Sequence, residues 1–193
     1  NLAKLRKAAE QGDAVAQDRL GFSYHYGVFG SPKDGAEAVK WYRMAAEQGH
    51  AIAQFNLGLM YANGEGVPED DTAAVKWYRK AAEQGYDEAQ YILGLKYTKG
   101  EGVPENHTAA VMWYRKAAEQ GHATAQYILG LMYAIGNGVP EDNVFAYMWF
   151  NLAAAQGHED AKRDKGMISE NMTKEQIAEA QKLSREWLAK RSK

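Results

Sequence analysis

The feature that most constrains the fold of this chain is a ten-residue string that returns at a fixed interval. The string KWYRMAAEQG ends at Gly49, and close copies of it end at Gly85, Gly121 and Gly157, each 36 residues further along the chain. Self-similarity at a period between about 20 and 50 residues is typical of solenoids and other repeat arrays. The period therefore predicts repeating units that bury their apolar faces by stacking on their neighbours.

One complete unit, residues 50–85, carries the pattern of two helices. In its first half Ala53, Leu57 and Tyr61 follow one another four residues apart, which places them on one stripe of a helix over about 50–63. The segment NGEGVP then interrupts this pattern with two glycines and a proline. The unit is therefore predicted to be a helix, a tight loop and a second helix.

The second helix of each unit has clear start and stop signals. It is predicted to begin after an Asp or Asn, whose side chain can accept hydrogen bonds from the first free backbone N–H groups. A glycine such as Gly85 ends the helix, because a C′ residue commonly adopts positive φ. The next helix follows almost at once, so the two helices must fold back on each other. The predicted caps are Asp34, Asp70, Asn106 and Asp142.

Charged residues four apart on the outer face of the second helices are expected to form weak surface pairs. Such (i, i+4) pairs contribute a few tenths of a kcal/mol each. The predicted pairs are Arg43–Glu47, Arg79–Glu83 and Arg115–Glu119.

The predicted fold class is all-α: a right-handed α-α superhelix, or solenoid, of about four to five helix-turn-helix repeats of 36 residues. A C-terminal capping helix is expected within 166–193, where Thr173 and Gln176 have the spacing of a capping box. The solenoid is expected to span 1–165, with a half unit at 1–12 and repeats at about 13–49, 50–85, 86–121 and 122–157.

The sequence offers little chemistry for catalysis or metal binding. It contains no cysteine, and so has neither a thiol nucleophile nor a Cys-ligated zinc site. His50, His122 and His158 occupy one repeat position, and stacked repeats place equivalent residues roughly 10 Å apart, too far to share one zinc ion. The glycine-rich loops lack the lysine of a P-loop, and no G-x-S-x-G is present. We predict no catalytic, cofactor-binding or metal-binding residue, no cofactor and no enzymatic activity.

Charge and hydropathy narrow the class of partner. The net charge of −2 argues against a dedicated nucleic-acid binder, which usually has a basic footprint. No apolar run approaches the ~18 residues that a membrane-spanning helix needs, so no membrane insertion is expected. The expected partner is a protein or a peptide, and the chain itself is expected to be a monomer or a weak oligomer.

The first helix of each unit is apolar on two sides. Ile52, Phe55 and Leu59 lie roughly opposite Leu57 at ~100° per residue. A surface helix is normally polar on its outer side, so a second apolar face indicates a second contact. Two interpretations stay open: the face packs against the following repeat, or it lines the concave surface of the superhelix as a groove for a partner.

Candidate partner-binding residues on this second face come from four repeats. Phe55, Tyr91 and Tyr127 would supply one aromatic ring per repeat to the floor of the groove. Polar selectivity would come from Asp18, Asn63 and Lys99, and the remaining candidates are Phe22, Leu59, Leu95, Leu131 and Ile135.

The repeat resembles the Sel-one-like repeat (SLR) family, relatives of the tetratricopeptide repeats. The pattern A-x-x-x-L-G-x-x-Y-x-x-G-x-G-V-x-x-D, followed by W-x-x-x-A-A-x-x-G, is met across 50–85 and almost fully in the units that start at Tyr86 and His122. The unit that starts at Asp13 replaces the loop with GVFGSPKDG, one residue longer. The resemblance implies a protein-binding scaffold or adaptor that uses its first helices, as a bacterial regulator, a host-interaction factor or a toxin-immunity protein.

The same resemblance raises one enzymatic alternative. Cysteine-rich relatives are described as β-lactam-binding or weakly β-lactam-hydrolysing proteins, but this chain lacks their cysteines and any obvious nucleophile. The resemblance also favours an exported or periplasmic bacterial location, with the cytoplasm as the alternative.

Overall fold

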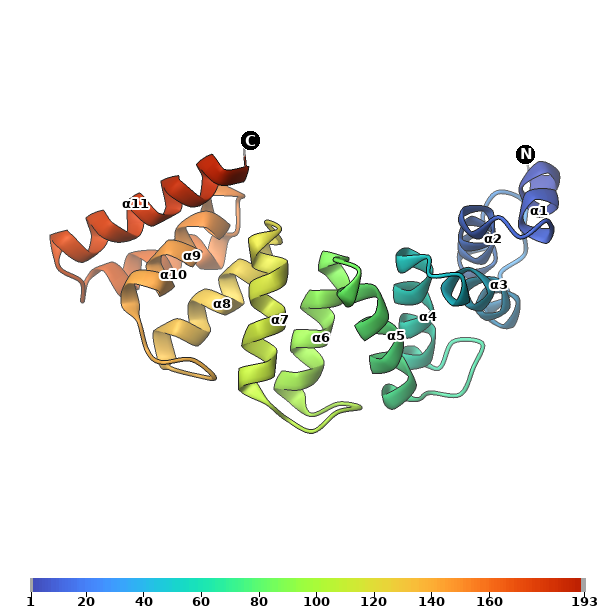
Figure 1. Ribbon diagram of the computed structural model, residues 1–193, viewed down its shortest axis with the longest axis horizontal. Coiled ribbons are helices and arrows are strands. Elements are labelled where there is room, and N and C mark those ends of the chain that lie inside the picture. The colour runs from blue at the N-terminus through green and yellow to red at the C-terminus, as the bar shows by residue number, and fades with distance from the viewer. Residues whose placement is uncertain (1, 192–193) are drawn as a thin grey trace. The chain divides into compact units, whose positions relative to one another are not determined.

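The computed structural model describes residues 2–191, and the regular secondary structure in this range is entirely α-helical (Figure 1). This confirms the all-α fold class. The helices described are α1 (Leu2–Glu10), α2 (Ala14–Tyr26), α3 (Gly35–Glu47), α4 (Ala51–Asn63), α5 (Asp71–Glu83), α6 (Asp87–Lys99), α7 (His107–Glu119), α8 (Ala123–Ile135), α9 (Asn143–Ala155), α10 (Glu159–Ser169) and α11 (Lys174–Arg191).

The helices form stacked hairpins, as a solenoid requires. We call α2, α4, α6, α8 and α10 the first helices, and α1, α3, α5, α7 and α9 the second helices. The pairs α2–α3, α4–α5 and α8–α9 pack as hairpins, and the second helices α1, α3, α5, α7 and α9 each pack on the first helix that follows. Contacts divide the chain into two compact units, residues 1–105 (unit 1) and 106–193 (unit 2).

The predicted caps begin the second helices. The side-chain oxygens of Asp34, Asp70 and Asn106 accept hydrogen bonds from the backbone N–H three residues on, at 2.9–3.0 Å. Asp142 caps α9 in the same way. The repeated histidines cap first helices: His50 Nδ1 accepts from the Ala53 N–H at 3.3 Å, and His122 and His158 make the equivalent bond. Their shared repeat position is thus explained by helix capping.

The predicted arginine–glutamate pairs are wrong for the described residues. The arginines instead donate to a tyrosine hydroxyl on the first helix of the next repeat, which joins neighbouring repeats. These bonds are Arg43–Tyr61 at 2.8 Å, Arg79–Tyr97 at 2.7 Å and Arg115–Tyr133 at 2.7 Å.

The C-terminal end adds one helix that the repeat pattern does not show. Residues 159–169 form α10, so the boundary predicted after residue 165 falls inside a helix. The capping box before α11 is confirmed, since the Thr173 N–H donates to Gln176 Oε1 at 2.8 Å and the Gln176 N–H donates to Thr173 Oγ1 at 3.2 Å. Helix α11 packs along α9 (Figure 1), where Trp187 and Trp149 lie edge to face at 6.3 Å.

Candidate functional site

The structure corrects the assignment of Phe55 as part of an open groove floor. Its side chain is only 9% exposed. The ring lies 5.7 Å from the ring of Tyr78 on α5 and 5.2 Å from the ring of Tyr86 at the start of α6. Phe55 therefore packs between its own hairpin and the next repeat, where an aromatic side chain buries a large apolar area. At this residue the packing interpretation is right.

Tyr127 also has internal partners, although it stays half-buried. Its ring lies 5.8 Å from Phe150 and 4.5 Å from His158, and its hydroxyl donates to the Asp164 carboxylate at 2.9 Å. Burial, and then the bond to Asp164, raise the pKa of the Tyr127 phenol. Tyr91 is half-buried too, and burial raises its pKa. The predicted aromatic column is thus largely used for contacts between helices.

The other candidates differ in their access to solvent. Phe22 is 42% exposed and Ile135 68% exposed, which is high for apolar side chains on helices that carry a core face. Asn63 donates to the Glu65 carboxylate at 3.1 Å, and Lys99 lies 3.8 Å from Glu101, so both polar candidates interact with the loop after their own helix. Leu59, Leu95 and Leu131 are half-buried.

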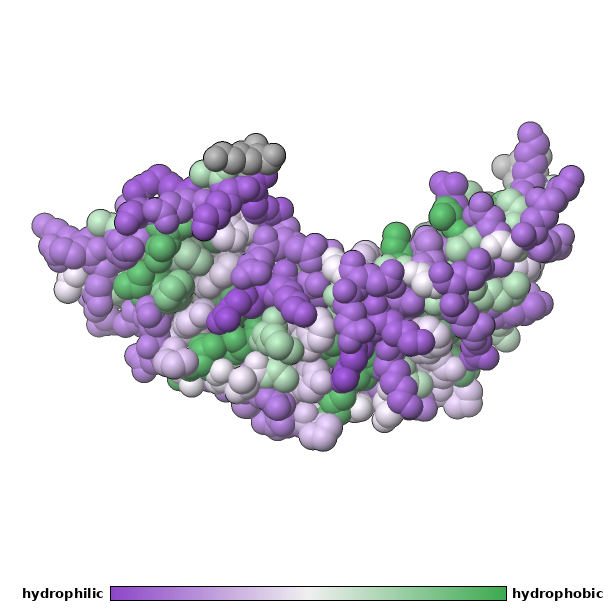
Figure 2. All heavy atoms as spheres, viewed as in Figure 1, coloured by the Kyte–Doolittle hydropathy of each residue, from purple (hydrophilic) through white to green (hydrophobic). Residues whose placement is uncertain are grey.

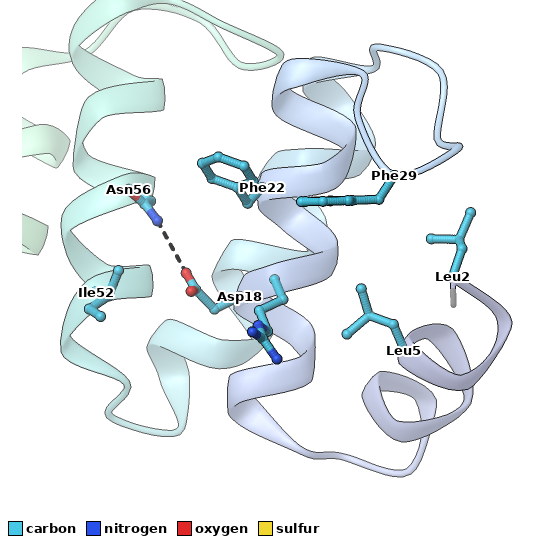
Figure 3. Close-up of a pocket in the computed structure, with 8 residues that line it drawn as sticks. Leu2, Leu5, Asp18, Phe22, Phe29, Ile52 and Asn56 are labelled. Carbon is cyan, nitrogen blue, oxygen red and sulfur yellow. Dashed lines mark hydrogen bonds between the residues drawn. The ribbon is translucent and has the colours of Figure 1, made fainter.

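Asp18 and Phe22 line a groove in unit 1 between α1, α2 and α4 (Figure 3). Its volume is about 740 Å³, within the range of pockets that hold ligands or side chains. Figure 3 shows Phe22 and Asp18 on α2 opposite Ile52 and Asn56 on α4. The apolar wall consists of Leu2, Leu5, Phe22, Phe29 and Ile52.

The polar part of this groove centres on Asp18. Asn56 Nδ2 donates to Asp18 Oδ1 at 3.1 Å across the two first helices. Burial raises the pKa of the Asp18 carboxyl, against the smaller opposing influences of His50, the Asn56 bond and Arg19. The groove therefore holds a partly desolvated carboxylate between apolar walls.

Phe29 is the groove residue that the sequence argument missed. Its side chain is 73% exposed. Its φ is +57°, and among the described residues it is the one residue other than glycine with a positive φ. Positive φ is rare for a bulky side chain and is worth examining for function. The signal was present in the sequence, because Phe29 lies in the loop that is one residue longer than its equivalents. Figure 3 shows its ring reaching from that loop toward Phe22.

Leu131 lines a separate groove in unit 2, between α8 and α10. This groove has a volume of about 580 Å³, and its apolar lining includes Ala134, Met167 and Ile168. Each unit thus has its own groove at a junction of first helices.

Among residues 2–191, no three His, Asp or Glu side chains come together in a way that could hold a metal ion. No helix in the described chain has the length and apolar character to cross a membrane.

The chain is similar in sequence and fold to several solved structures. Among solved structures, a Sel1 repeat protein from Oxalobacter formigenes is 38% identical, with a TM-score of 0.78 over 85% of this chain and 72% of that one. The protective antigen c5321 of uropathogenic Escherichia coli, which displays an SLR fold, is 31% identical with a TM-score of 0.62. That match covers 97% of this chain and 48% of c5321, so this chain spans about half the length of c5321.

A third structure, cysteine rich protein B of Helicobacter pylori, is 28% identical with a TM-score of 0.54, over 66% of this chain and 96% of that one. No curated protein matches the chain. The Sel1 repeat itself matches residues 5–13, 14–50, 51–86, 87–122 and 123–158. The chain therefore belongs to the Sel1 repeat family.

Proposed function

We propose that this protein is a non-catalytic scaffold that binds a partner protein or peptide on the exposed face of its first helices. Sel1 repeat proteins are generally protein-interaction scaffolds and typically non-catalytic. The observation that carries the proposal is the exposure of large apolar side chains on these helices, at Phe22, Ile52 and Ile135. Apolar side chains that gather at a surface mark interaction sites.

The surface around these side chains supports the proposal. Figure 2 shows hydrophobic residues at the surface in both units, among mostly hydrophilic ones. The grooves of about 740 Å³ in unit 1 and about 580 Å³ in unit 2 give concave sites where a partner's side chains can be desolvated. The proposed contacts are Asp18, Phe22, Ile52, Leu59, Asn63, Leu95, Lys99, Leu131 and Ile135, with the half-buried edges of Tyr91 and Tyr127.

The test is affinity capture from an extract of the source cells with matched variants of the full chain. Phe22→Ser and Ile135→Ser remove exposed apolar groups from first helices, while Met44→Ser and Met112→Ser remove similarly exposed groups from second helices. We expect the first pair to release a protein that the second pair retains. Equal retention by all four variants, or loss only with the methionine variants, would contradict the proposal.

The captured protein also decides between specific roles. A regulator, a host-interaction factor and a toxin-immunity protein would each use such a surface. A secreted toxin as the captured protein would support the immunity role.

A further inference from the structure

The fifth residue of α4 and of α8 faces a junction between two repeats. In α4 this residue is Phe55, whose ring packs against Tyr78 and Tyr86. In α8 it is Tyr127, whose ring packs against Phe150 and His158. At both junctions an aromatic ring packs against the neighbouring helices.

In α2 the same position holds a carboxylate. The residues equivalent to the ring partners are Tyr42 and His50, and both interact electrostatically with Asp18. An aspartate side chain is much smaller than a phenyl or phenol ring. Asp18 therefore lies at the floor of the open groove, with Phe22 and Ile52 beside it (Figure 3).

The carboxylate has a charge that the protein itself satisfies only in part. Oδ1 accepts one hydrogen bond, from Asn56, and a carboxylate can accept several. His50 has the largest influence in favour of the charged form, but its Nδ1 accepts from the Ala53 N–H. Arg19 also lines the groove, but its side chain is exposed and its influence on Asp18 is the smallest of those that favour the charged form. A buried or half-buried charge without strong partners is costly, so a cationic donor from outside would be favoured here.

We propose that the unit 1 groove receives a lysine or arginine side chain of the partner protein. The aliphatic stem packs between Phe22 and Ile52, and the cationic head donates to Asp18. Lysine and arginine commonly bury their stems on apolar surface in this way, and the Phe22 ring adds a favourable surface for the cation. This inference rests on the proposed function and names the chemistry that one of its grooves selects.

Other occupants fit this groove less well. A purely aliphatic side chain would cover Asp18 without giving it a donor, which leaves a desolvated acceptor unpaired. An acidic side chain would be repelled by the carboxylate. A neutral donor could bond to Asp18 but would lack the charge-assisted part of the interaction, and the experiment below distinguishes that case.

The test is a titration of the ¹⁵N-labelled full chain with two capped tripeptides, acetyl-Leu-Arg-Leu-amide and its citrulline analogue. Citrulline has nearly the shape of arginine and keeps some of its N–H donors, but a carbonyl oxygen replaces one nitrogen and the group has no charge. We expect shifts at Phe22, Ile52 and Asn56, and an affinity for the arginine peptide about tenfold higher than for the citrulline peptide. Equal affinities, shifts confined to other regions, or no shift up to about 10 mM peptide would overturn the inference.

Two variants assign the preference to the carboxylate. Asp18→Asn should keep a folded spectrum and bind both peptides alike. The matched control is Asp164→Asn in unit 2, because that carboxylate already accepts from the Tyr127 hydroxyl, so the arginine preference should be unchanged. A preference that survives in Asp18→Asn would also overturn the inference.

Failure of this inference can be separated from failure of the proposed function. If the arginine preference is absent while Phe22→Ser still releases the captured partner, the scaffold function stands and the lysine or arginine assignment falls. If Phe22→Ser retains the partner, unit 1 does not bind it through this groove, and the proposed function fails there.

Discussion

At the residue scale, two apolar side chains on α4 show how burial separates structural positions from positions open to a partner. Leu57 is fully buried, whereas Ile52, five residues earlier, is 44% exposed. Leu57→Ala is predicted to lower the free energy of unfolding by about 2–5 kcal/mol, through lost transfer energy and the cavity that remains. Ile52→Ala should change it by less than about 0.5 kcal/mol. Urea denaturation of both variants measures the difference, and similar losses would contradict this assignment of faces.

Buried glutamines form a second set of structural residues that repeat along the chain. Gln54 Nε2 donates to the Ala46 carbonyl of the preceding repeat at 3.0 Å, and its Oε1 accepts from Gln84 at 2.7 Å. Gln17 and Gln126 make the same two bonds, each with its own neighbours. The repeat pattern of the sequence analysis does not include these glutamines, because their role depends on a contact between repeats.

Gln54→Met tests this role. Methionine has a similar volume but leaves the Ala46 carbonyl and the Gln84 amide without their partner, so unfolding should become easier by about 1–3 kcal/mol. Gln84→Met is the control, since Gln84 is exposed and water can replace its bond. Chemical denaturation should show the larger loss for Gln54→Met, and a smaller loss than in the control would contradict the account.

Asp18 gives a prediction of pH dependence. Because burial raises its pKa in the folded protein, the folded state binds the proton more tightly than the unfolded state, whose carboxyl titrates near about 3.9. The favourable contribution is therefore present below that value and is lost as the pH rises through the folded pKa. Asp18→Asn should raise the melting temperature at pH 7, with a smaller gain at pH 3.5. A lower melting temperature at pH 7 would show that Asp18 stabilises the fold.

At the scale of elements, the G-x-G loops join neighbouring repeats by backbone contact. Gly66 has a φ of +70°, and a Cβ atom there would lie 2.1 Å from the carbonyl carbon of Gly35, at the start of α3. Gly102 and Gly138 make the same close approach to Asp71 and His107, the first residues of α5 and α7. This close approach gives a structural reason for the second glycine of each loop.

Gly66→Ala should destabilise the protein more than Gly85→Ala. Gly85 also has a positive φ, +91°, but a Cβ atom there meets nothing within 4 Å. Gly85→Ala should therefore cost only the backbone strain, about 1–2 kcal/mol, and Gly66→Ala a further 1–3 kcal/mol or so for the overlap. Thermal or chemical denaturation measures both values. Equal losses would show that the loop moves away at little cost.

The elements also show where sequence reasoning works and where it stops. Caps such as Asp70 and the Thr173 capping box are local, so their residue types and spacing predict the helix starts correctly. Helix α10 was missed because its sequence keeps the cap at His158 and a buried Ala161 but has Lys165 and Ser169 where the repeat has its leucine and tyrosine. Its place depends on packing against α9, which the repeat pattern does not encode.

At the scale of the whole molecule, the period of 36 residues was enough to predict an all-helical repeat protein, and the resemblance of the repeat pattern indicated the family that the comparison confirms. It was not enough to predict the site. A repeat pattern treats equivalent positions alike, whereas Phe55 is enclosed and Asp18 lies in an open groove, because each side chain fills its junction differently. The unit 1 groove thus comes from departures from the repeat, at Asp18 and at the longer loop with Phe29.

The most direct test of the central claim is site-specific crosslinking to the partner. The chain contains no cysteine, so one introduced cysteine carries one photo-crosslinker without competing labels. Ile52→Cys places it on a first helix in the unit 1 groove, and Met44→Cys places it at a similarly exposed position on the second helix α3. The account predicts a crosslinked partner from Ile52→Cys and little or none from Met44→Cys. A partner crosslinked from Met44→Cys but not from Ile52→Cys would show that the protein binds through its other face.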